Sequence, residues 1–217
     1  MTALIRAEGI SYSYPVRGMV LDQADLSLFA GERMSLEGGN GAGKTTLLNL
    51  LVGLNKPKAG QIFAFGRERK VEADFIEVRS KAGFLFQDPD DQLFCPTVLE
   101  DVAFGPLNQG KTPAEAQRLS LEVLDCLGMA GFEDRVTHQL SGGEKRLITL
   151  ASVLAMQPEV LLLDEPSNAL DSRARSRLIE VLQSLPQAMI IISHEPSFLD
   201  ALVTRRTRLE AGKVIPA

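Results

Sequence analysis

The sequence predicts an α/β protein with a mostly parallel sheet flanked by helices, an N-terminal antiparallel β-subdomain and a helical subdomain inserted at about residues 88–140. Two aliphatic runs, 160–163 and 188–192, are typical of parallel strands that are buried on both faces. A strand-like run at 33–37 leads through a glycine-rich loop into helical spacing at 45–54. This strand, loop and helix form the repeating unit of an α/β sheet.

Composition narrows the class of protein. We expect residues 1–217 to form one domain that contains the insertion. The net charge of −5 argues against nucleic acid as the main partner. Cys95 and Cys126 lie far apart, which predicts free thiols in a reducing compartment. No signal-peptide pattern is visible, and no run approaches the roughly 20 apolar residues of a membrane span. We therefore expect a cytosolic chain that can reach a membrane through a partner.

The glycine-rich loop fits the phosphate-binding pattern G-x-x-x-x-G-K-[ST]. Glycines let the backbone curl so that several N–H groups face phosphate oxygens, and the following helix adds its N-terminal partial charge. Lys44 would reach the outer phosphates, and the Thr45 hydroxyl would hold Mg²⁺. The candidate phosphate-binding residues are Gly38, Gly39, Asn40, Gly41, Ala42, Gly43, Lys44, Thr45 and Thr46.

Short strands at 4–8 and 26–29 precede this loop and predict a small antiparallel sheet beside the nucleotide site. Tyr14 lies between them. Its flat ring suits an adenine base, although a tyrosine that simply covers the sheet fits the spacing as well.

The chain continues with a strand at 61–65 and a polar loop with a short helix at 66–81. A short apolar strand then runs from Gly83 to Gln87. A glutamine at the end of a buried strand could bind Mg²⁺ or orient a water, or it could only cap the strand.

The segment from Gln87 to about Leu140 reads as the helical insertion. A capping box at Thr97 predicts a helix that ends at Gly105-Pro106, and a second helix opens at Thr112. The apolar residues near the start of the insertion could be its core or an exposed docking patch. They are Leu93, Phe94 and Val98.

A second glycine-rich helix start follows at Ser141, Gly142 and Gly143. Free N–H groups and a hydroxyl could bind a second anion there, although an ordinary helix cap explains the serine too.

Acidic residues come directly after the first aliphatic run, at Asp164 and Glu165. Ligands of open α/β sheets bind at the carboxyl ends of strands. Asp164 could hold Mg²⁺ through water, and Glu165 could polarise a water for attack on a γ-phosphate. The second run ends at His194, which could hydrogen-bond that phosphate, whereas His138 has no such placement. A capped helix from Asp171 and two short strands within 207–215 complete the chain.

These motifs, in this order, resemble the nucleotide-binding subunit of ATP-binding-cassette (ABC) transporters over nearly the whole chain. The resemblance is carried by Tyr14, the phosphate loop 38–46, the Q-loop residue Gln87, the signature 140–144, the Walker B residue Glu165, the D-loop 169–171 and His194.

A narrower resemblance, to the ATPases of cobalt/nickel and energy-coupling-factor importers, lies in two segments. Residues 86–94 read Phe-Gln-Asp-Pro-Asp-Asp-Gln-Leu-Phe, and residues 98–106 end in Glu-Asp-Val-Ala-Phe-Gly-Pro. The triplet 166–168, Pro-Ser-Asn, departs from the Pro-Thr-Ala-Gly of many relatives. The short chain after His194 favours metal-type or biotin-type systems.

The resemblance implies ATP hydrolysis with Mg²⁺, coupled to transport at the cytoplasmic face of the cell membrane. It implies a second ATP-binding subunit, identical or paralogous, whose ATP would meet Ser141, Gly142 and Gly143. It also implies a transmembrane coupling subunit and a substrate-binding membrane subunit, and no nucleic acid. The implied catalytic residues are Lys44, Gln87, Glu165 and His194, and the implied metal ligands are Thr45, Gln87 and Asp164.

The expected cargo is Co²⁺ or Ni²⁺, with biotin or another vitamin as the alternative. A soluble cassette ATPase that acts on ribosomes or DNA is a third reading. A single cassette, a short helical insertion and an acidic net charge weigh against it.

Overall fold

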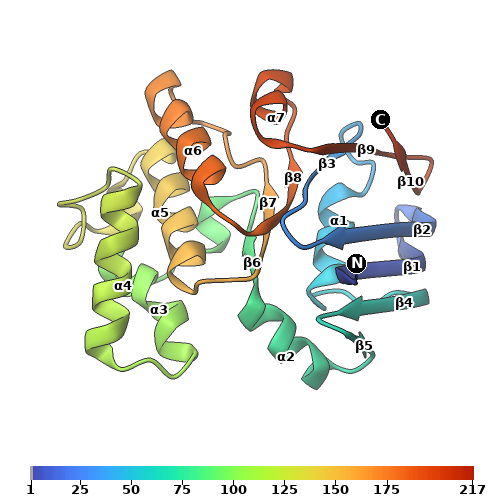
Figure 1. Ribbon diagram of the computed structural model, residues 1–217, viewed down its shortest axis with the longest axis horizontal. Helices are drawn as coiled ribbons and strands as arrows, with labels where there is room; N and C mark the ends of the chain where they lie inside the picture. The colour runs from blue at the N-terminus through green and yellow to red at the C-terminus, as the bar shows by residue number, and fades with distance from the viewer. Residues whose placement is uncertain (1) are drawn as a thin grey trace. The chain divides into compact units, whose positions relative to one another are not determined.

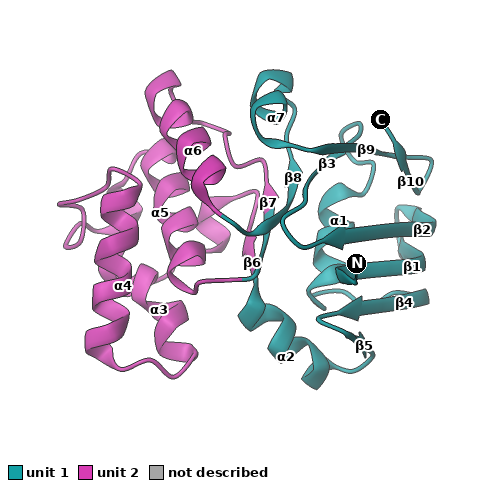
Figure 2. Ribbon diagram, in the orientation of Figure 1, with its two compact units in different colours: residues 1–82, 159–162, 186–217 teal, residues 83–158, 163–185 magenta. Residues whose placement is uncertain are grey.

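The computed structural model describes residues 2–217 and divides into two compact units (Figure 1, Figure 2). Unit 1 contains the described residues through Ala82, together with Glu159–Leu162 and Pro186–Ala217. Unit 2 contains Gly83–Pro158 and Leu163–Leu185. The predicted limits of the inserted helical subdomain, 88–140, stay a prediction.

The first sheet of unit 1 is antiparallel, as expected, with strand order β2-β1-β4-β5 (Figure 1). Its strands are β1 (Ala3–Tyr14), β2 (Gly18–Phe29), β4 (Ala59–Ala64) and β5 (Arg67–Arg69). The strands expected at 4–8 and 26–29 are confirmed, but both are longer than expected. The buried positions of β1 change from odd to even between Ala7 and Ile10, where Gly9 has φ +58° and the pairing register shifts. This bulge breaks the period-2 pattern and hides the length of the strand.

The second sheet has the order β10-β9-β3-β8-β7-β6. Its strands are β3 (Arg33–Glu37), β6 (Ala82–Leu85), β7 (Val160–Asp164), β8 (Ala188–Ile192), β9 (Arg205–Glu210) and β10 (Lys213–Pro216). In unit 1, β3 lies between β8 and β9 and is parallel to both, whereas β10 runs antiparallel to β9. Every residue of β7 and β8 is buried, which explains their unbroken aliphatic sequences.

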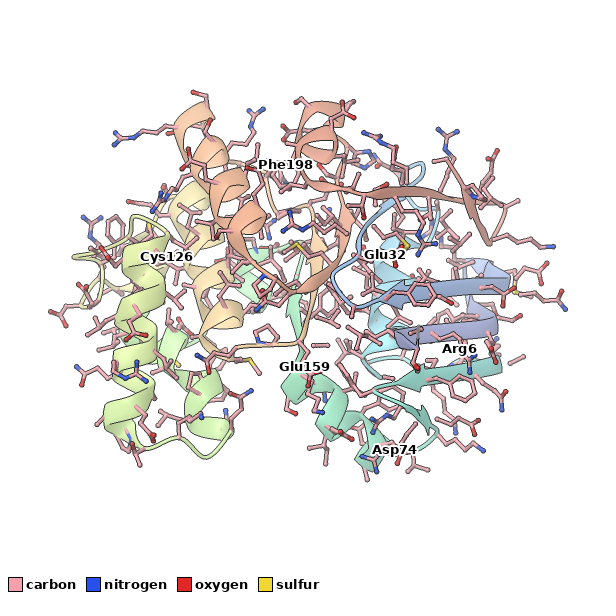
Figure 3. The ribbon with its side chains drawn as sticks, in the orientation of Figure 1. Arg6, Glu32, Asp74, Cys126, Glu159 and Phe198 are labelled. Carbon is pink, nitrogen blue, oxygen red and sulfur yellow. The ribbon has the colours of Figure 1, made fainter. Side chains whose placement is uncertain are left out.

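Three helices belong to unit 1: α1 (Lys44–Leu51), α2 (Glu72–Lys81) and α7 (Pro196–Leu202). Phe198 of α7 is fully buried (Figure 3). We expected a polar loop with a short helix at 66–81; the helix is confirmed as the ten-residue α2, but the residues before it form the strand β5. Only Phe75 and Val78 of α2 are buried, so its apolar pattern is weak. The helix start is fixed by Asp74, whose carboxylate accepts the backbone N–H groups of Lys70 and Val71.

Unit 2 is mainly helical, and its α3, α4 and α5 pack on one another. Its helices are α3 (Val98–Asn108), α4 (Pro113–Cys126), α5 (Gly142–Ala155) and α6 (Ser172–Ser184). The capping box at Thr97 is confirmed, and the helix expected to open at Thr112 is α4, which also begins with a capping box. The predicted end of α3 at Gly105-Pro106 was wrong, because α3 continues to Asn108. A Cβ on Gly105 would lie 2.5 Å from Cγ of Met156, so this glycine allows close packing instead of ending the helix.

Candidate functional site

The phosphate loop in unit 1 leaves β3 and enters α1, and Lys44 lies within its curl. The Lys44 side chain is buried, and its Nζ donates to the carbonyl oxygens of Gly38 at 2.8 Å and Gly39 at 3.2 Å. The ammonium group is thus held against the first residues of the loop. An ammonium group held at this position can bind the outer phosphates of a nucleotide with little change of rotamer.

Two glycines of the loop stand where no other residue fits. Gly38 has φ +144°, and a Cβ there would lie 2.7 Å from the carbonyl oxygen of Leu209. Gly43 has φ +109°, and a Cβ there would lie 2.4 Å from Cγ1 of Val20. The surrounding strands therefore impose the tight curl that the loop sequence permits.

Arg17, which the sequence analysis did not single out, contacts the same loop. It lies on the exposed turn between β1 and β2, and its Nη2 donates to the carbonyl oxygen of Gly41. A Cβ on Gly41 would lie 2.2 Å from that nitrogen. No local sequence signal indicates this contact, because it depends on where the β1–β2 turn folds.

Tyr14, at the end of β1, lies beside the start of α1. Its hydroxyl is 3.2 Å from Oγ1 of Thr46, and either group could be the donor. Its ring packs edge-on against Tyr12, with centroids 5.0 Å apart. The structure thus brings Tyr14 to the loop, as a stacking role requires, and its ring remains half-buried.

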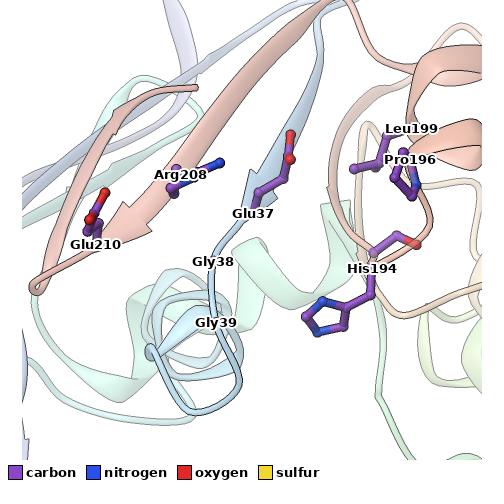
Figure 4. A pocket seen from close by; sticks show the side chains of 9 residues that line it. Glu37, Gly38, Gly39, His194, Pro196, Leu199, Arg208 and Glu210 are labelled. Carbon is purple, nitrogen blue, oxygen red and sulfur yellow. The ribbon is translucent and has the colours of Figure 1, made fainter.

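A cavity of about 390 Å³ in unit 1 brings His194 together with the first glycines of the loop (Figure 4). His194 follows β8 and is exposed. The cavity is lined by Glu37, Gly38, Gly39, Ser193, His194, Pro196, Leu199, Arg208 and Glu210. The charged residues from β9, Arg208 and Glu210, were not predicted, because they reach the cavity only through the parallel pairing of β9 with β3.

The predicted carboxylates follow the aliphatic residues of β7 in unit 2. Asp164 is only 1% exposed, and Glu165 is partly buried with φ +52°. Ala169, four residues further on, also has a positive φ of 63°. Left-handed conformations of non-glycine residues cost about 1–3 kcal/mol and gather at functional segments. The left-handed backbone at Glu165 is consistent with a functional turn, although Phe65 and Ala211 also have positive φ directly after strands.

Ser141 is the N-cap of α5, and its cap is complete. Its Oγ accepts the backbone N–H of Glu144 at 3.3 Å, and the Glu144 carboxylate accepts the Ser141 N–H at 2.8 Å. The backbone and hydroxyl hydrogen bonds from Ser141 lower the pKa of Glu144. A Cβ on Gly143 would lie 3.1 Å from the carbonyl oxygen of Ala169, so the helix start lies close against that turn. Ser141 thus acts as a helix cap, which was one of its two predicted roles. The other role, anion binding, stays a prediction.

The strand expected to end at Gln87 ends at Leu85, so Gln87 is exposed just beyond β6, and its backbone is fixed by Arg146 of α5. Nη1 of Arg146 donates to the Phe86 carbonyl at 2.6 Å, and Nη2 donates to the Gln87 carbonyl at 2.5 Å. Burial lowers the pKa of Arg146, although the nearby charges of Asp164, Asp88 and Glu165 raise it in part. The sequence analysis missed Arg146. The available signal was a charged residue on the same helical face as the buried Leu150 and Val153.

The predicted residues thus fall into two sets, each described within its own unit. Tyr14, the loop 38–46 and His194 belong to unit 1. Gln87, Ser141, Gly142, Gly143, Asp164 and Glu165 belong to unit 2.

Comparison with known families identifies the family of this chain, whereas the roles of the individual residues stay predictions. The family model described as "ABC transporter" matches residues 21–168, which is more than half of the chain. The chain belongs to the ABC transporter family. The matched segment contains the phosphate loop, Gln87, the signature and both carboxylates.

Relatives of this ABC protein carry related names. A protein of Brucella suis biovar 1, provisionally named an ABC transporter ATP-binding protein, is 53% identical over 100% of this chain and 90% of its own length. The energy-coupling factor transporter ATP-binding protein EcfA of Methanothermobacter thermautotrophicus is 40% identical, over 98% of this chain and 70% of its own. The cobalt import ATP-binding protein CbiO of Rhodobacter capsulatus is 40% identical, over 99% of this chain and 78% of its own length.

Solved structures confirm the predicted fold of this ABC protein. CbiO1 of Clostridium perfringens, part of the CbiONQ transporter complex, superposes with a TM-score of 0.85, 30% identity and coverage of 99% and 88% of the two chains. A dimeric bacterial ABC transporter cassette superposes with a TM-score of 0.88, 25% identity and coverage of 97% and 96%. The chain is therefore an ABC ATP-binding subunit, and it is an ATPase.

Proposed function

We propose that this ABC ATPase powers a membrane importer of the cobalt/nickel or energy-coupling-factor type, with Co²⁺ or Ni²⁺ as the cargo. The observation that carries the proposal is the 40% identity, over nearly the whole chain, to relatives named for cobalt import and for energy coupling. The segment 86–94, with its run of acids and amides, supports the same subgroup. Biotin or another vitamin is the alternative cargo, because an ATPase subunit does not itself select the cargo.

The residues of the candidate site receive the following roles in this proposal. The loop amides and Lys44 bind the phosphates of ATP, and Tyr14 stacks on the adenine. Glu165 polarises the attacking water, and His194 hydrogen-bonds the γ-phosphate. Gln87 orients the water or the metal ion.

Mg²⁺ is the metal ion that the chemistry of the donors fits. Mg²⁺ prefers oxygen ligands and is usually bound by one or two protein groups together with phosphates and waters. The buried carboxylate of Asp164, the Thr45 hydroxyl and the Gln87 amide are such groups. When bound, the ion would supply charge neutralisation for the β- and γ-phosphates.

The proposed partners are a second ATP-binding subunit, identical or paralogous, and two kinds of membrane subunit. None of the helices in residues 2–217 is long and apolar enough to cross a membrane. In this proposal, a transmembrane coupling subunit and a substrate-binding membrane subunit hold the chain at the cytoplasmic face of the cell membrane. Ser141, Gly142 and Gly143 would contact the γ-phosphate of the ATP held by the other ATP-binding subunit.

Replacement of the proposed base tests the catalytic assignment. Glu165→Gln should lower kcat by about a hundredfold or more while ATP binding persists, because general-base catalysis contributes about 10²–10⁴. The variant should also dimerise in saturating MgATP, as measured by light scattering. Glu159→Gln, which removes an exposed carboxylate paired with Lys81, is the control and should retain full activity. Near-normal turnover of Glu165→Gln would remove Glu165 as the base, and a monomer in ATP would contradict the pairing of two subunits.

A further inference from the structure

Arg146 is a buried charged residue to which the proposed mechanism gives no role. It lies in the first half of α5, the helix that Ser141 caps, and is 2% exposed. Removing a guanidinium group from water costs free energy unless hydrogen bonds and opposite charges compensate. The contacts of Arg146 therefore indicate what the chain gains by burying it.

The hydrogen bonds of Arg146 go to backbone, and not to a carboxylate. Its two terminal nitrogens donate to two consecutive carbonyls directly after β6, those of Phe86 and Gln87, at 2.6 and 2.5 Å. A guanidinium presents two parallel donors in one plane, whereas a lysine ammonium has no such fork. The guanidinium thus fixes the orientation of the peptide that carries Gln87.

The charge of Arg146 is balanced separately from its hydrogen bonds. Asp164, Asp88 and Glu165 lie near enough to favour its charged form. Its Nε is buried and has no hydrogen-bond partner among the described residues. The side chain is therefore oriented to bind the two carbonyls, and this orientation leaves its Nε–H without a hydrogen bond.

Three further contacts hold the same segment, residues 86–92. The Gln92 amide accepts the Phe86 N–H at 3.0 Å and donates to the Phe84 carbonyl at 3.1 Å. Nζ of Lys145, the neighbour of Arg146, lies 2.6 Å from the Asp90 carboxylate. The segment is thus tied back to β6 by Gln92 and to α5 by two consecutive basic residues.

We propose that Arg146 is a positioning residue that fixes the Gln87 peptide to the helix beginning at Ser141. The Q-loop glutamine and the signature serine then keep one arrangement while nucleotide binds and is hydrolysed. The effect on turnover rests on the proposed function of Gln87, whereas the tether itself does not.

Hydrogen exchange of the purified full chain tests the tether. Arg146→Lys and Arg146→Met should both increase the exchange of the amides in 86–93 without nucleotide. Arg177→Lys is the matched control, because Nε and Nη2 of Arg177 also donate to a backbone carbonyl, that of Cys126, but on the exposed surface. Unchanged exchange in both Arg146 variants would overturn the proposal. If Arg146→Met does not fold, Arg146→Lys decides, since it retains the charge and most of the volume.

A double-mutant cycle with Gln87→Ala tests whether the tether acts through Gln87. Arg146→Lys should lower kcat at least about tenfold with KM little changed, because small displacements of a catalytic group are costly. In the Gln87→Ala background, Arg146→Lys should cause no further loss. Independent, additive losses would overturn the positioning role. If Gln87→Ala alone leaves kcat unchanged, the proposed function of Gln87 fails, and hydrogen exchange still decides the tether.

Discussion

The residue type at two positions of the phosphate loop is restricted to glycine by the atoms packed around it. Leu209 and Val20 leave no room for a Cβ at Gly38 and Gly43, and Lys44 bonds the carbonyls that the curl turns inward. The surrounding backbone and side chains therefore favour the curled shape of the loop. Such preorganisation reduces the entropy cost of binding.

Tyr14 gives a prediction at this scale, because its ring and its hydroxyl have separate roles. Tyr14→Ala should weaken ATP binding about tenfold or more, since stacking on a base is worth about 1–3 kcal/mol. Tyr14→Phe should retain the affinity and lose only the hydrogen bond with Thr46, worth about 1 kcal/mol of stability. Titration of each variant with a fluorescent ATP analogue measures the affinity. Equal losses in both variants would show that the hydroxyl, and not the ring, binds the nucleotide.

At the scale of elements, the antiparallel sheet is shaped by the irregularity in β1. Gly60 of β4 crosses it so closely that a Cβ would lie 2.5 Å from the carbonyl oxygens of both Glu8 and Gly9. Backbone cannot move aside as a side chain can, so this crossing requires glycine.

Substitution of two glycines measures that crossing. Gly66, with φ +78°, has open space around it, whereas Gly60, with φ +92°, does not. Gly66→Ala should cost about 1–2 kcal/mol for the left-handed backbone alone. Gly60→Ala should cost about 1–3 kcal/mol more, because the sheet must also move. Urea unfolding measures the loss of unfolding free energy in each variant. Equal losses would mean that β1 can shift to accommodate a Cβ at residue 60.

Helix α2 is attached to β5 through Glu77, which gives a prediction about pH. The hydrogen bond from Arg69 is the main cause that lowers the pKa of Glu77 from 4.5 to about 2, and Arg67 and Lys81 add to it. The ionised carboxylate thus favours the folded state above pH 4.5, and this stabilisation is lost as the pH falls from 4.5 towards about 2. Glu77→Gln should therefore lose less stability than the wild type over that interval, as measured by urea unfolding. Parallel pH curves would show that the ion pairs contribute nothing.

At the scale of the whole molecule, exposed apolar residues of unit 2 bear on the proposed membrane partners. Val98 is core, but Phe94 is 65% exposed and Phe104 is 45% exposed, and their rings pack edge to face with centroids 4.7 Å apart. Two exposed aromatic rings that cover each other present a small apolar surface to a partner. Of the three residues that the sequence left open, Val98 is core, Leu93 is partly buried and Phe94 is exposed, whereas docking of a partner there stays a prediction.

Charge on that surface should weaken assembly without unfolding the protein. Phe94→Glu should reduce the amount of ATPase recovered with a co-expressed membrane coupling subunit, while basal ATP hydrolysis persists. Ile76→Glu, at a residue 64% exposed on α2, is the matched control. Full recovery of the complex with Phe94→Glu would exclude Phe94 from the docking surface.

The sequence by itself determined the strand–loop–helix unit, the buried parallel strands and the order of the motifs, because each depends on residues close together in the chain. It also determined the capping boxes of α3, α4 and α5, where a serine or threonine and a glutamate lie three residues apart. Local hydrogen bonds and hydrophobic periodicity leave their mark directly in the sequence.

Only the tertiary structure decided the contacts between distant segments. Arg146 reaches carbonyls 60 and 59 residues away, and Arg17 meets Gly41 across 24 residues. Every residue carries the same backbone carbonyl group, so a sequence pattern does not reveal which carbonyl a distant arginine will bind. The length of β1 could not be predicted for a related reason. A bulge shifts the alternation of buried and exposed residues by which a strand is recognised in a sequence. Only the pairing of β1 with β2 and β4 shows that the strand continues beyond the bulge.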